Sequence, residues 1–258
     1  MAGSVLGTEV RRVEDPELLR GEATYVDNLP IPDAAHIAFV RSPFAHAEIT
    51  GIDTAEALQA DGVLAVYTAK DLDLAPVRPF MVVNAACERP PLAIDRVRFV
   101  GDPVAVIVAE TRAAAVDAVE LVDVDYEPLP VVADPEAALA DDAPLQFPDL
   151  GTNIAAGERD EDGAEILADA DVVARARIEN QRVAVVPLEG NAIAVEPGGG
   201  HLGGDYDLTI HVSTQMPHVV WKRAAKQLGL DADRLHLVTP HVAARSAARS
   251  ASSPSTTW

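Results

Sequence analysis

The sequence contains very few cysteines, and this shortage excludes several classes of structure. Cys87 is the only cysteine among 258 residues. A single thiol excludes an internal disulfide, and it cannot by itself hold an iron–sulfur cluster or a structural zinc site. No residue near it in the sequence forms a plausible catalytic pair with it, so we expect Cys87 to be a buried or idle thiol.

Basic residues and long apolar runs are also scarce. The chain has 20 Lys and Arg against 41 Asp and Glu, a formal net charge of -21. Such a surface repels phosphate backbones and anionic lipids, so we expect neither nucleic acid nor a membrane as a partner. No stretch approaches the roughly 18 apolar residues of a spanning helix, and the first residues lack the pattern of a signal peptide. The expected location is therefore the cytoplasm.

The chain nevertheless has enough apolar sequence for a sizeable core, because 48% of its residues are hydrophobic. Apolar runs bounded by turn residues predict strands, and apolar residues at helical spacing after a capping residue predict helices. In the first half, strands are expected at residues 36–41, 47–52, 63–68, 97–100, 104–109 and 122–127, and helices at 54–60 and 111–122. This alternation predicts a mixed α/β (α+β) fold.

The flanking regions have a different character. Residues 1–28 are expected to be an extended lead-in with a one-turn helix at 15–19, capped by Asp15. Residues 134–150 are an acidic linker rich in Ala, Asp and Pro. Beyond the linker, strands are expected at 172–178, 190–195, 208–213 and 235–238, and a helix at 217–228 that Gly229 ends.

Few residues stand out as chemical groups. The glycine-rich stretch 197–204 favours a hairpin loop over a phosphate loop, because no Gly-Lys-Ser/Thr follows it and no helix begins there. Seven scattered histidines include no pair four residues apart on a helix and have no cysteine nearby, so we expect no metal site. Glu189 lies in a strand-rich setting and must be hydrogen-bonded or titrate upward, which leaves a structural and a functional role open.

Several segments, in order and spacing, resemble the molybdopterin-binding large subunit of the xanthine dehydrogenase/aldehyde oxidase family, most closely its carbon monoxide dehydrogenase-like branch. The segments that carry this resemblance are Arg-Val-Glu-Asp at 12–15, Tyr-Val-Asp-Asn-Leu at 25–29, Arg-Ser-Pro-Phe-Ala-His-Ala at 41–47, Val-Gly-Asp-Pro-Val-Ala at 100–105, Val-Asp-Tyr-Glu-Pro-Leu-Pro at 124–130, Asn-Gln-Arg at 180–182, Pro-Leu-Glu at 187–189 and Ser-Thr-Gln-Met-Pro-His at 213–218. Each motif alone is weak, and their combination is specific.

The resemblance implies an organisation and a chemistry. Residues 29–133 would be the α/β hammerhead domain, and 151–242 the opening portion of the molybdopterin-binding domain. The implied activity is oxidation of aldehydes, N-heterocycles or carbon monoxide with water-derived oxygen, using a molybdopterin cytosine dinucleotide-type molybdenum cofactor. FAD-binding and [2Fe–2S] companion subunits would take the electrons, which suits a chain with one cysteine. Gln181 is the best match to the family glutamine that hydrogen-bonds the molybdenum ligands.

The chain departs from the family pattern after Val242. Where the family continues with a glycine-rich loop, residues 243–246 are Ala-Ala-Arg-Ser, and the segment 243–258 has no family character. Bulkier residues prevent the close backbone approach that the cofactor requires. Glycine codons of GC-rich DNA, read one base out of frame, give mostly Ala and Arg, so we hypothesise a frameshift or truncated gene. A fragment that lacks this loop and the family's catalytic glutamate is expected to be inactive alone and not to retain the cofactor.

Two other interpretations stay open from the residues alone. The hammerhead domain could act as a non-catalytic protein–protein binding or assembly module without redox chemistry. The chain could also be an unrelated acidic α/β enzyme, although no pocket with converging ionisable groups can be located from sequence. Molybdenum content after expression with companion subunits distinguishes an active enzyme from the fragment and module interpretations.

Overall fold

The computed structural model describes residues 7, 12–77, 84–157, 167–180 and 189–242. The chain divides into two compact units. The first comprises the described residues of Pro32–Val186, and the second those of Met1–Ile31 and Pro187–Ser246. Helices and strands occur in both, so the fold is mixed α/β as the sequence predicts. Among the described residues, no helix is both long and apolar enough to cross a lipid bilayer.

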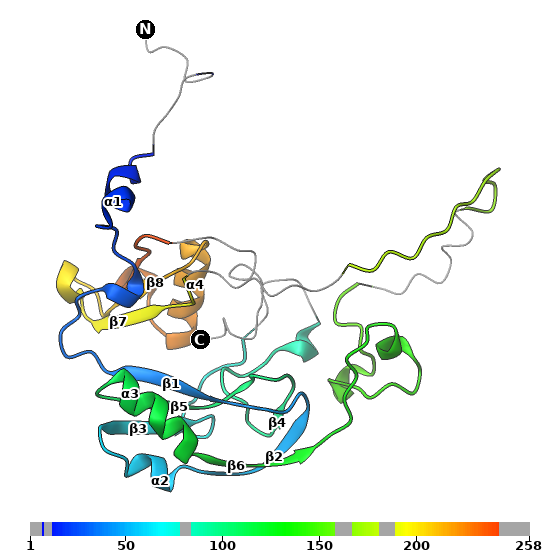
Figure 1. The fold of residues 1–258 in the computed structure, drawn as a ribbon, viewed down its shortest axis with the longest axis horizontal. Helices are drawn as coiled ribbons and strands as arrows, with labels where there is room; N and C mark the ends of the chain where they lie inside the picture. Colours follow the sequence, from blue (N-terminus) through cyan, green and yellow to red (C-terminus); the bar gives the residue numbers. More distant parts are fainter. Residues whose placement is uncertain (1–6, 8–11, 78–83, 158–166, 181–188, 243–258) are drawn as a thin grey trace. The chain divides into compact units, whose positions relative to one another are not determined.

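The Pro32–Val186 unit contains two three-stranded antiparallel sheets among its described residues (Figure 1). Their orders are β1-β5-β3 and β4-β2-β6. The strands are β1 (His36–Arg41), β2 (Ala47–Asp53), β3 (Val63–Thr68), β4 (Arg96–Val97), β5 (Pro103–Ala109) and β6 (Asp123–Pro128). Five of these lie within about a residue of the predicted positions, and the fourth is shorter than predicted.

The helices of this unit are short. They are α2 (Ala55–Leu58), η2 (Ala85–Cys87), α3 (Arg112–Asp117), η3 (Ala118–Leu121), η4 (Ala137–Leu139) and η5 (Pro148–Leu150). Of these, α2, α3 and η3 contact the sheet that contains β1, β3 and β5. The helix predicted over 111–122 is α-helical only to Asp117 and then tightens into the 3-10 turn of η3. Thr111 caps it as predicted, because its side-chain oxygen accepts a hydrogen bond from the Ala114 N–H at 3.1 Å.

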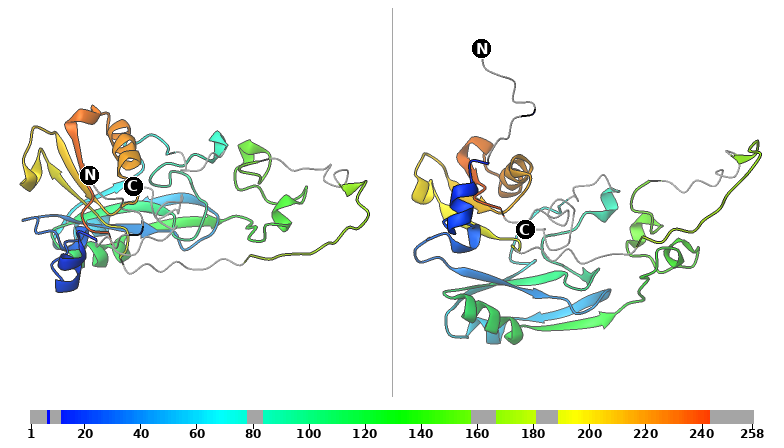
Figure 2. Two further views of the ribbon diagram at one scale, coloured as in Figure 1. Left: turned by 90° about the horizontal axis from the view of Figure 1, so that it is seen from above. Right: turned by 45° about the horizontal axis from the view of Figure 1, so that its top comes forward.

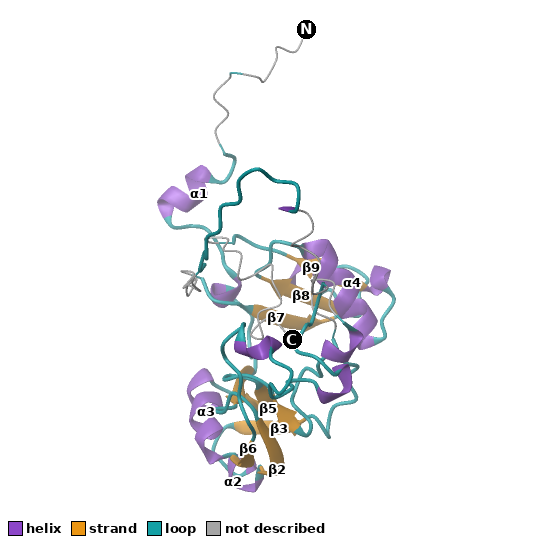
Figure 3. Ribbon diagram, turned by 90° about the vertical axis from the view of Figure 1, so that its right-hand side faces the viewer, coloured by secondary structure: helices purple, strands orange, loops and turns teal. Residues whose placement is uncertain are grey.

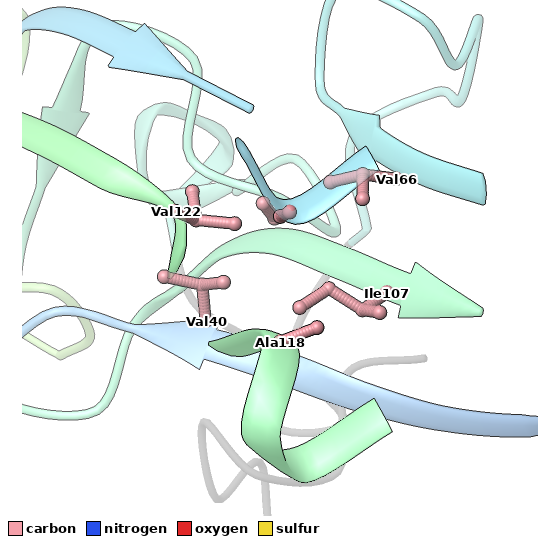
Figure 4. Close-up of a cluster of buried hydrophobic side chains, with 7 residues drawn as sticks. Val40, Val66, Ile107, Ala118 and Val122 are labelled. Carbon is pink, nitrogen blue, oxygen red and sulfur yellow. The ribbon is translucent and has the colours of Figure 1, made fainter. Parts of the chain in front are cut away.

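The core of the unit forms where β5, the most apolar strand, meets the second predicted helix. Val40, Val66, Ile107, Ala118 and Val122 point toward one another in Figure 4, and Ile107 and Ala118 are almost completely buried. Removing an Ile side chain from water contributes about 1.5–3 kcal/mol. Apolar residues on both sides of β5 are covered, which confirms the expectation drawn from its nearly continuous apolar sequence.

Two strand predictions were wrong. Of the run 97–100, only Val97 belongs to a strand, because a tight turn follows it. In this turn the Arg98 N–H donates to the Asp102 carboxylate at 2.9 Å, and the Asp102 N–H donates to the Phe99 carbonyl at 3.1 Å. The residues at 172–178 form no strand within the described chain and are drawn as an extended loop in Figure 2. Val172 and Ile178 are 86% and 88% exposed, so the apolar pattern has no sheet to pack on.

The second unit is built on one three-stranded sheet of order β7-β8-β9 (Figure 3). Its elements are α1 (Asp15–Arg20), η1 (Val26–Asn28), β7 (Ile193–Pro197), η7 (Gly200–Leu202), β8 (Leu208–Val212), α4 (Pro217–Leu228), η8 (Ala232–Arg234) and β9 (Leu235–Val238). β7 and β8 are antiparallel, which confirms the predicted hairpin, whereas β8 and β9 are parallel and joined through α4.

Helix α4 packs on one face of this sheet, as Figure 1 shows. Ile210 and Val212 of β8 are buried with Ala225 of the helix and Leu235 of β9. The indole N–H of Trp221 donates to the carbonyls of Ala232 and Leu235 at 3.1 and 2.9 Å, which fixes the return from the helix to β9. Gly229 ends α4 in the left-handed region, as the sequence predicts.

The N-terminal lead-in belongs to the second unit. Its helix α1 begins with Asp15 as the first helical residue and Glu14 before it, so the expectation that Asp15 caps the helix was wrong. Further on, Val26 is buried and η1 contacts β7. The N–H of His241 donates to the Thr24 carbonyl at 3.2 Å. Residues at the two ends of the described chain therefore fold together.

Candidate cofactor-binding site

The carboxyl ends of the parallel strands β8 and β9 meet at one edge of the second sheet. His211 is paired with Val238 near the ends of the two strands. Ser213, Thr214 and Gln215 follow β8 directly, and Thr239 follows β9. Ligands of α/β proteins bind outside the carboxyl ends of parallel strands, where the loops leave backbone and side-chain groups available.

The antiparallel strand β7 begins at the same edge. Ile193 is opposite Val212, so the residues before β7 lie beside the end of β8. Ser213 holds them there: its N–H donates to the Ala192 carbonyl at 3.1 Å, its side-chain oxygen accepts from the Ala192 N–H at 3.2 Å, and its hydroxyl donates to the Gly190 carbonyl at 3.4 Å. We call Glu189, Gly190, 213–215 and Thr239 the polar edge.

Two residues of the polar edge are buried. Ser213 is 4% exposed and Thr214 is 6% exposed. The hydroxyl of Thr214 accepts a hydrogen bond from the Met216 N–H at 3.1 Å and so fixes the entry to α4. The buried hydroxyl of Thr239 has no hydrogen-bond partner within the described ranges. A buried hydroxyl without a partner costs about 1–3 kcal/mol, so this position suits a polar group supplied from outside these residues.

The residues singled out from the sequence lie in different parts of the chain, and one of them lies outside the described residues. Gln181 lies outside the described residues, so its predicted role stays a prediction. Glu189 lies at the polar edge, next to Gly190, and both roles considered for it stay predictions. Cys87 is buried in η2, as expected for an idle thiol. The glycine-rich stretch is the hairpin connection between β7 and β8, also as expected.

The position of Thr239 at this edge was not predicted from the sequence. Its signal was the strand–helix–strand spacing over 208–238, which is typical of a parallel pair and places the residues after both strands at one edge. The chemistry offered there is mostly hydrogen bonding by hydroxyl, amide and backbone groups. Such groups fit a heterocyclic ligand that presents several donors and acceptors, and Glu189 adds a carboxylate.

Comparison with known proteins identifies two matching domain models. Residues 20–130 match the sequence model of the aldehyde oxidase and xanthine dehydrogenase a/b hammerhead domain, and residues 147–243 match that of the molybdopterin cofactor-binding domain. The polar edge falls within the second match. The chain belongs to the xanthine dehydrogenase/aldehyde oxidase family.

Family members with curated descriptions align along most of the chain. The large subunit of nicotine 6-hydroxylase from Paenarthrobacter nicotinovorans is 36% identical over 257 residues, covering 92% of this chain and 29% of that protein. The carbon monoxide dehydrogenase large chain of Afipia carboxidovorans is 35% identical over 252 residues, covering 92% of this chain and 30% of the relative. The chain thus spans about three tenths of the length of these relatives.

Solved structures of family members have the same fold in this region. The Cu,Mo-CO dehydrogenase crystal structure superimposes with a TM-score of 0.78 at 34% identity and covers 92% of this chain and 31% of its own. Quinoline 2-oxidoreductase from Pseudomonas putida 86 gives a TM-score of 0.76 at 34% identity, covering 92% of this chain and 30% of that chain. Mixed helix and strand content in both units agrees with this relationship.

Proposed function

We propose that this chain is the N-terminal part of the large subunit of a molybdenum hydroxylase and that the polar edge forms one wall of its molybdopterin site. In this proposal residues 29–133 are the hammerhead domain and 151–242 the opening portion of the cofactor domain, with 1–28, 134–150 and 243–258 as lead-in, linker and tail. The observation that carries the proposal is the convergence of Glu189, Ser213 and Thr239 at the carboxyl ends of β8 and β9.

The polar edge would orient the cofactor rather than react with it. The buried Thr239 hydroxyl is available to hydrogen-bond a pterin ring atom, and Ser213 holds the chain around Gly190 at the edge. Gln181 is the residue proposed to hydrogen-bond the metal ligands. When bound, a molybdenum cofactor of the molybdopterin cytosine dinucleotide type supplies two-electron oxidation of aldehydes, N-heterocycles or carbon monoxide with oxygen from water.

We propose that the 258-residue chain by itself neither retains the cofactor nor is active. Residues 243–246 are Ala-Ala-Arg-Ser at the position of the family's glycine-rich loop, and a Cβ on each residue keeps the backbone farther from a bound ligand. A chain of about three tenths of a relative's length also leaves most of a cofactor's surface for other segments to contact.

Companion subunits and location are part of the same proposal. The relatives include the large subunit of nicotine 6-hydroxylase and subunit gamma of the 6-hydroxypseudooxynicotine dehydrogenase complex, so those proteins act in assemblies. We propose FAD-binding and [2Fe–2S] companions for this chain as well, in the cytoplasm. The single cysteine supports separate companions, because each [2Fe–2S] cluster requires four ligand side chains.

A chimera tests the proposal directly. Residues 1–242 of this chain would be fused to the remainder of the Afipia carboxidovorans large chain, starting at its glycine-rich loop, and produced in a host that makes the cofactor. Molybdenum is measured by mass spectrometry after gel filtration. The chimera is expected to hold the metal at a level close to that of the parent protein, whereas the 258-residue chain holds none.

Single substitutions in the chimera test the individual residues. Thr239→Val and Gln181→Ala are expected to lower the molybdenum content, and Thr50→Val is the matched control because Thr50 lies on β2 of the other unit. A monodisperse chimera that holds no molybdenum would refute the proposal. Equal metal content in the Thr239 variant and the control would contradict the proposal that the polar edge contacts the cofactor.

A further inference from the structure

A second group of potential ligands lies elsewhere in the same unit, at the hairpin between β7 and β8. Glu196 comes from β7, His211 from β8 and His201 from η7 in the connecting loop. One potential ligand atom from each residue lies within 4.8 Å of the other two. Hydrogen bonding within the cluster was not foreseeable from the sequence, in which the two histidines are ten positions apart.

The register of the hairpin explains why Glu196 and His211 meet. Glu196 is directly opposite Thr209, so His211 is its diagonal neighbour on the same face of the sheet. The Nε2 atom of His211 lies 2.8 Å from Glu196 Oε2. The face is strongly desolvated, because His211 is 1% exposed and Glu196 is 8% exposed.

His201 completes the cluster from the loop. Its Nδ1 atom also lies 2.8 Å from Glu196 Oε2, and its backbone N–H donates to Glu196 Oε1 at 3.1 Å. The two imidazole rings stack with their centroids 5.2 Å apart and an interplanar angle of 16°. Both nitrogens are thus directed at the same carboxylate oxygen, one from each side chain.

The loop is shaped for this contact by Gly200. Its φ is +56°, and a Cβ at this position would lie 2.6 Å from Glu196 Oε2. Any other residue would push the carboxylate away from the two histidines or unwind η7. The glycine therefore permits the close return of His201, which gives the glycine-rich sequence of the hairpin a specific structural purpose.

We propose that Glu196, His201 and His211 bind a divalent transition metal ion of the Zn²⁺ class, at a site separate from the polar edge. Two imidazole nitrogens and one carboxylate oxygen are a ligand set that suits Zn²⁺ and disfavours Mg²⁺ and Ca²⁺, which prefer oxygen ligands. The proposal does not depend on the proposed molybdenum chemistry, because it rests on these three residues alone.

The three ligand atoms would have to move to accept the ion. Metal–ligand distances of about 2.0–2.2 Å place tetrahedral ligand atoms about 3.3 Å apart, so the present 2.8 Å N···O separations would widen by about half an ångström. The two histidine nitrogens, which lie within 4.8 Å of each other, would have to reach the same spacing. The metal would replace the two N–H···O hydrogen bonds, and each imidazole would then carry its proton on the opposite ring nitrogen, His201 Nε2 and His211 Nδ1. The side chain of His201 is 38% exposed, which leaves an entry path and room for a water as fourth ligand.

The test is a metal titration of the full 258-residue chain, produced without a histidine tag. Zn²⁺ affinity is measured by competition with a chromophoric chelator, and Co²⁺ serves as a spectroscopic probe because tetrahedral Co²⁺ gives visible absorption bands. We expect one Zn²⁺ per chain, no competition by Mg²⁺, and Co²⁺ bands that Zn²⁺ abolishes.

Variants assign the site to its residues. His201→Ala is expected to weaken Zn²⁺ binding at least about tenfold. Loss of a residue that only hydrogen-bonds a metal ligand already lowers metal affinity about 10–100-fold, and loss of a ligand should cost no less. Gly200→Ala should weaken it similarly by displacing the Glu196 carboxylate. His218→Ala, exposed on α4, is the matched control and should bind as the wild-type chain does.

The outcomes are distinguishable from misfolding. His201 is partly exposed, so its variant should retain the far-UV circular dichroism of the wild-type chain even if His211→Ala does not fold. Absence of Zn²⁺ binding to the folded wild-type chain would overturn the proposal. Binding of equal strength in folded His201→Ala and in the His218→Ala control would overturn it as well.

Discussion

Ile107 and Ile178 provide a paired test of the packing described for the Pro32–Val186 unit. Both isoleucines lie in apolar runs that the sequence predicts as strands, yet Ile107 is completely buried in the core and Ile178 is 88% exposed. Replacing Ile107 by Ala removes three carbon atoms from a cluster that includes Val40, Val66 and Ala118. The expected loss in free energy of unfolding is about 2–5 kcal/mol, against about 0.5–1.5 kcal/mol for Ile107→Val.

Urea unfolding followed by far-UV circular dichroism measures these losses. For a denaturant dependence of about 2 kcal/mol per molar, a 3 kcal/mol loss lowers the midpoint by about 1.5 M. Ile178→Ala is the control and should change the stability by less than about 0.5 kcal/mol. The fluorescence of Trp221, measured in a Trp258→Phe background, follows the other unit, in which the indole contacts β9.

The reasoning would be refuted by equal effects at the two positions. If Ile107→Ala cost no more than Ile178→Ala, the apolar cluster shown in Figure 4 would not be what stabilises the unit. A midpoint that shifted only in the Trp221 signal would place the effect in the wrong unit.

Three further predictions concern the same unit. Burial raises the pKa of Asp102 above its ordinary value of 3.8, so the folded chain keeps a proton there that the unfolded chain has lost. The stability of the wild-type chain relative to Asp102→Asn should therefore fall as the pH rises from about 4 through the folded pKa, and urea titrations that showed a rise would contradict this. Thr111→Ala should cost about 1 kcal/mol because it removes the cap of α3, whereas Thr54→Ala, at a helix start without a side-chain cap, should change little in the same assay. Gly62→Ala should lower the melting temperature, because Gly62 has φ +77° and an added Cβ would lie 3.3 Å from that of Ala114; an unchanged melting temperature would count against the turn geometry.

Local periodicity predicted most of the elements because it reports burial on one face. The alternation in β6 and the apolar run of β5 located both strands, and the spacing in α4 located the helix together with the glycine that ends it. The same reasoning failed at 172–178, where the apolar residues alternate but no described strand pairs with them. Periodicity shows that a strand could form and carries no information about whether a partner is present.

The candidate site was less accessible from sequence than the fold. Motif resemblance pointed to the correct family, and the family matches confirmed it. The position of Thr239 beside the end of β8 depends on β8 and β9 being parallel, and the convergence of His201 and His211 depends on the register of a hairpin with a glycine-rich connection. Both are long-range arrangements that single-residue patterns do not encode.

The labelling rate of the single thiol, Cys87, can report conformational opening of the chain. The residue is 6% exposed in η2, so a thiol-reactive reagent can reach the sulfur only when the segment around it opens. With no second cysteine in the sequence, the rate of labelling counts those opening events without background from other sites. Mass spectrometry of the intact chain during labelling would therefore follow local opening in real time, with no engineered reporter.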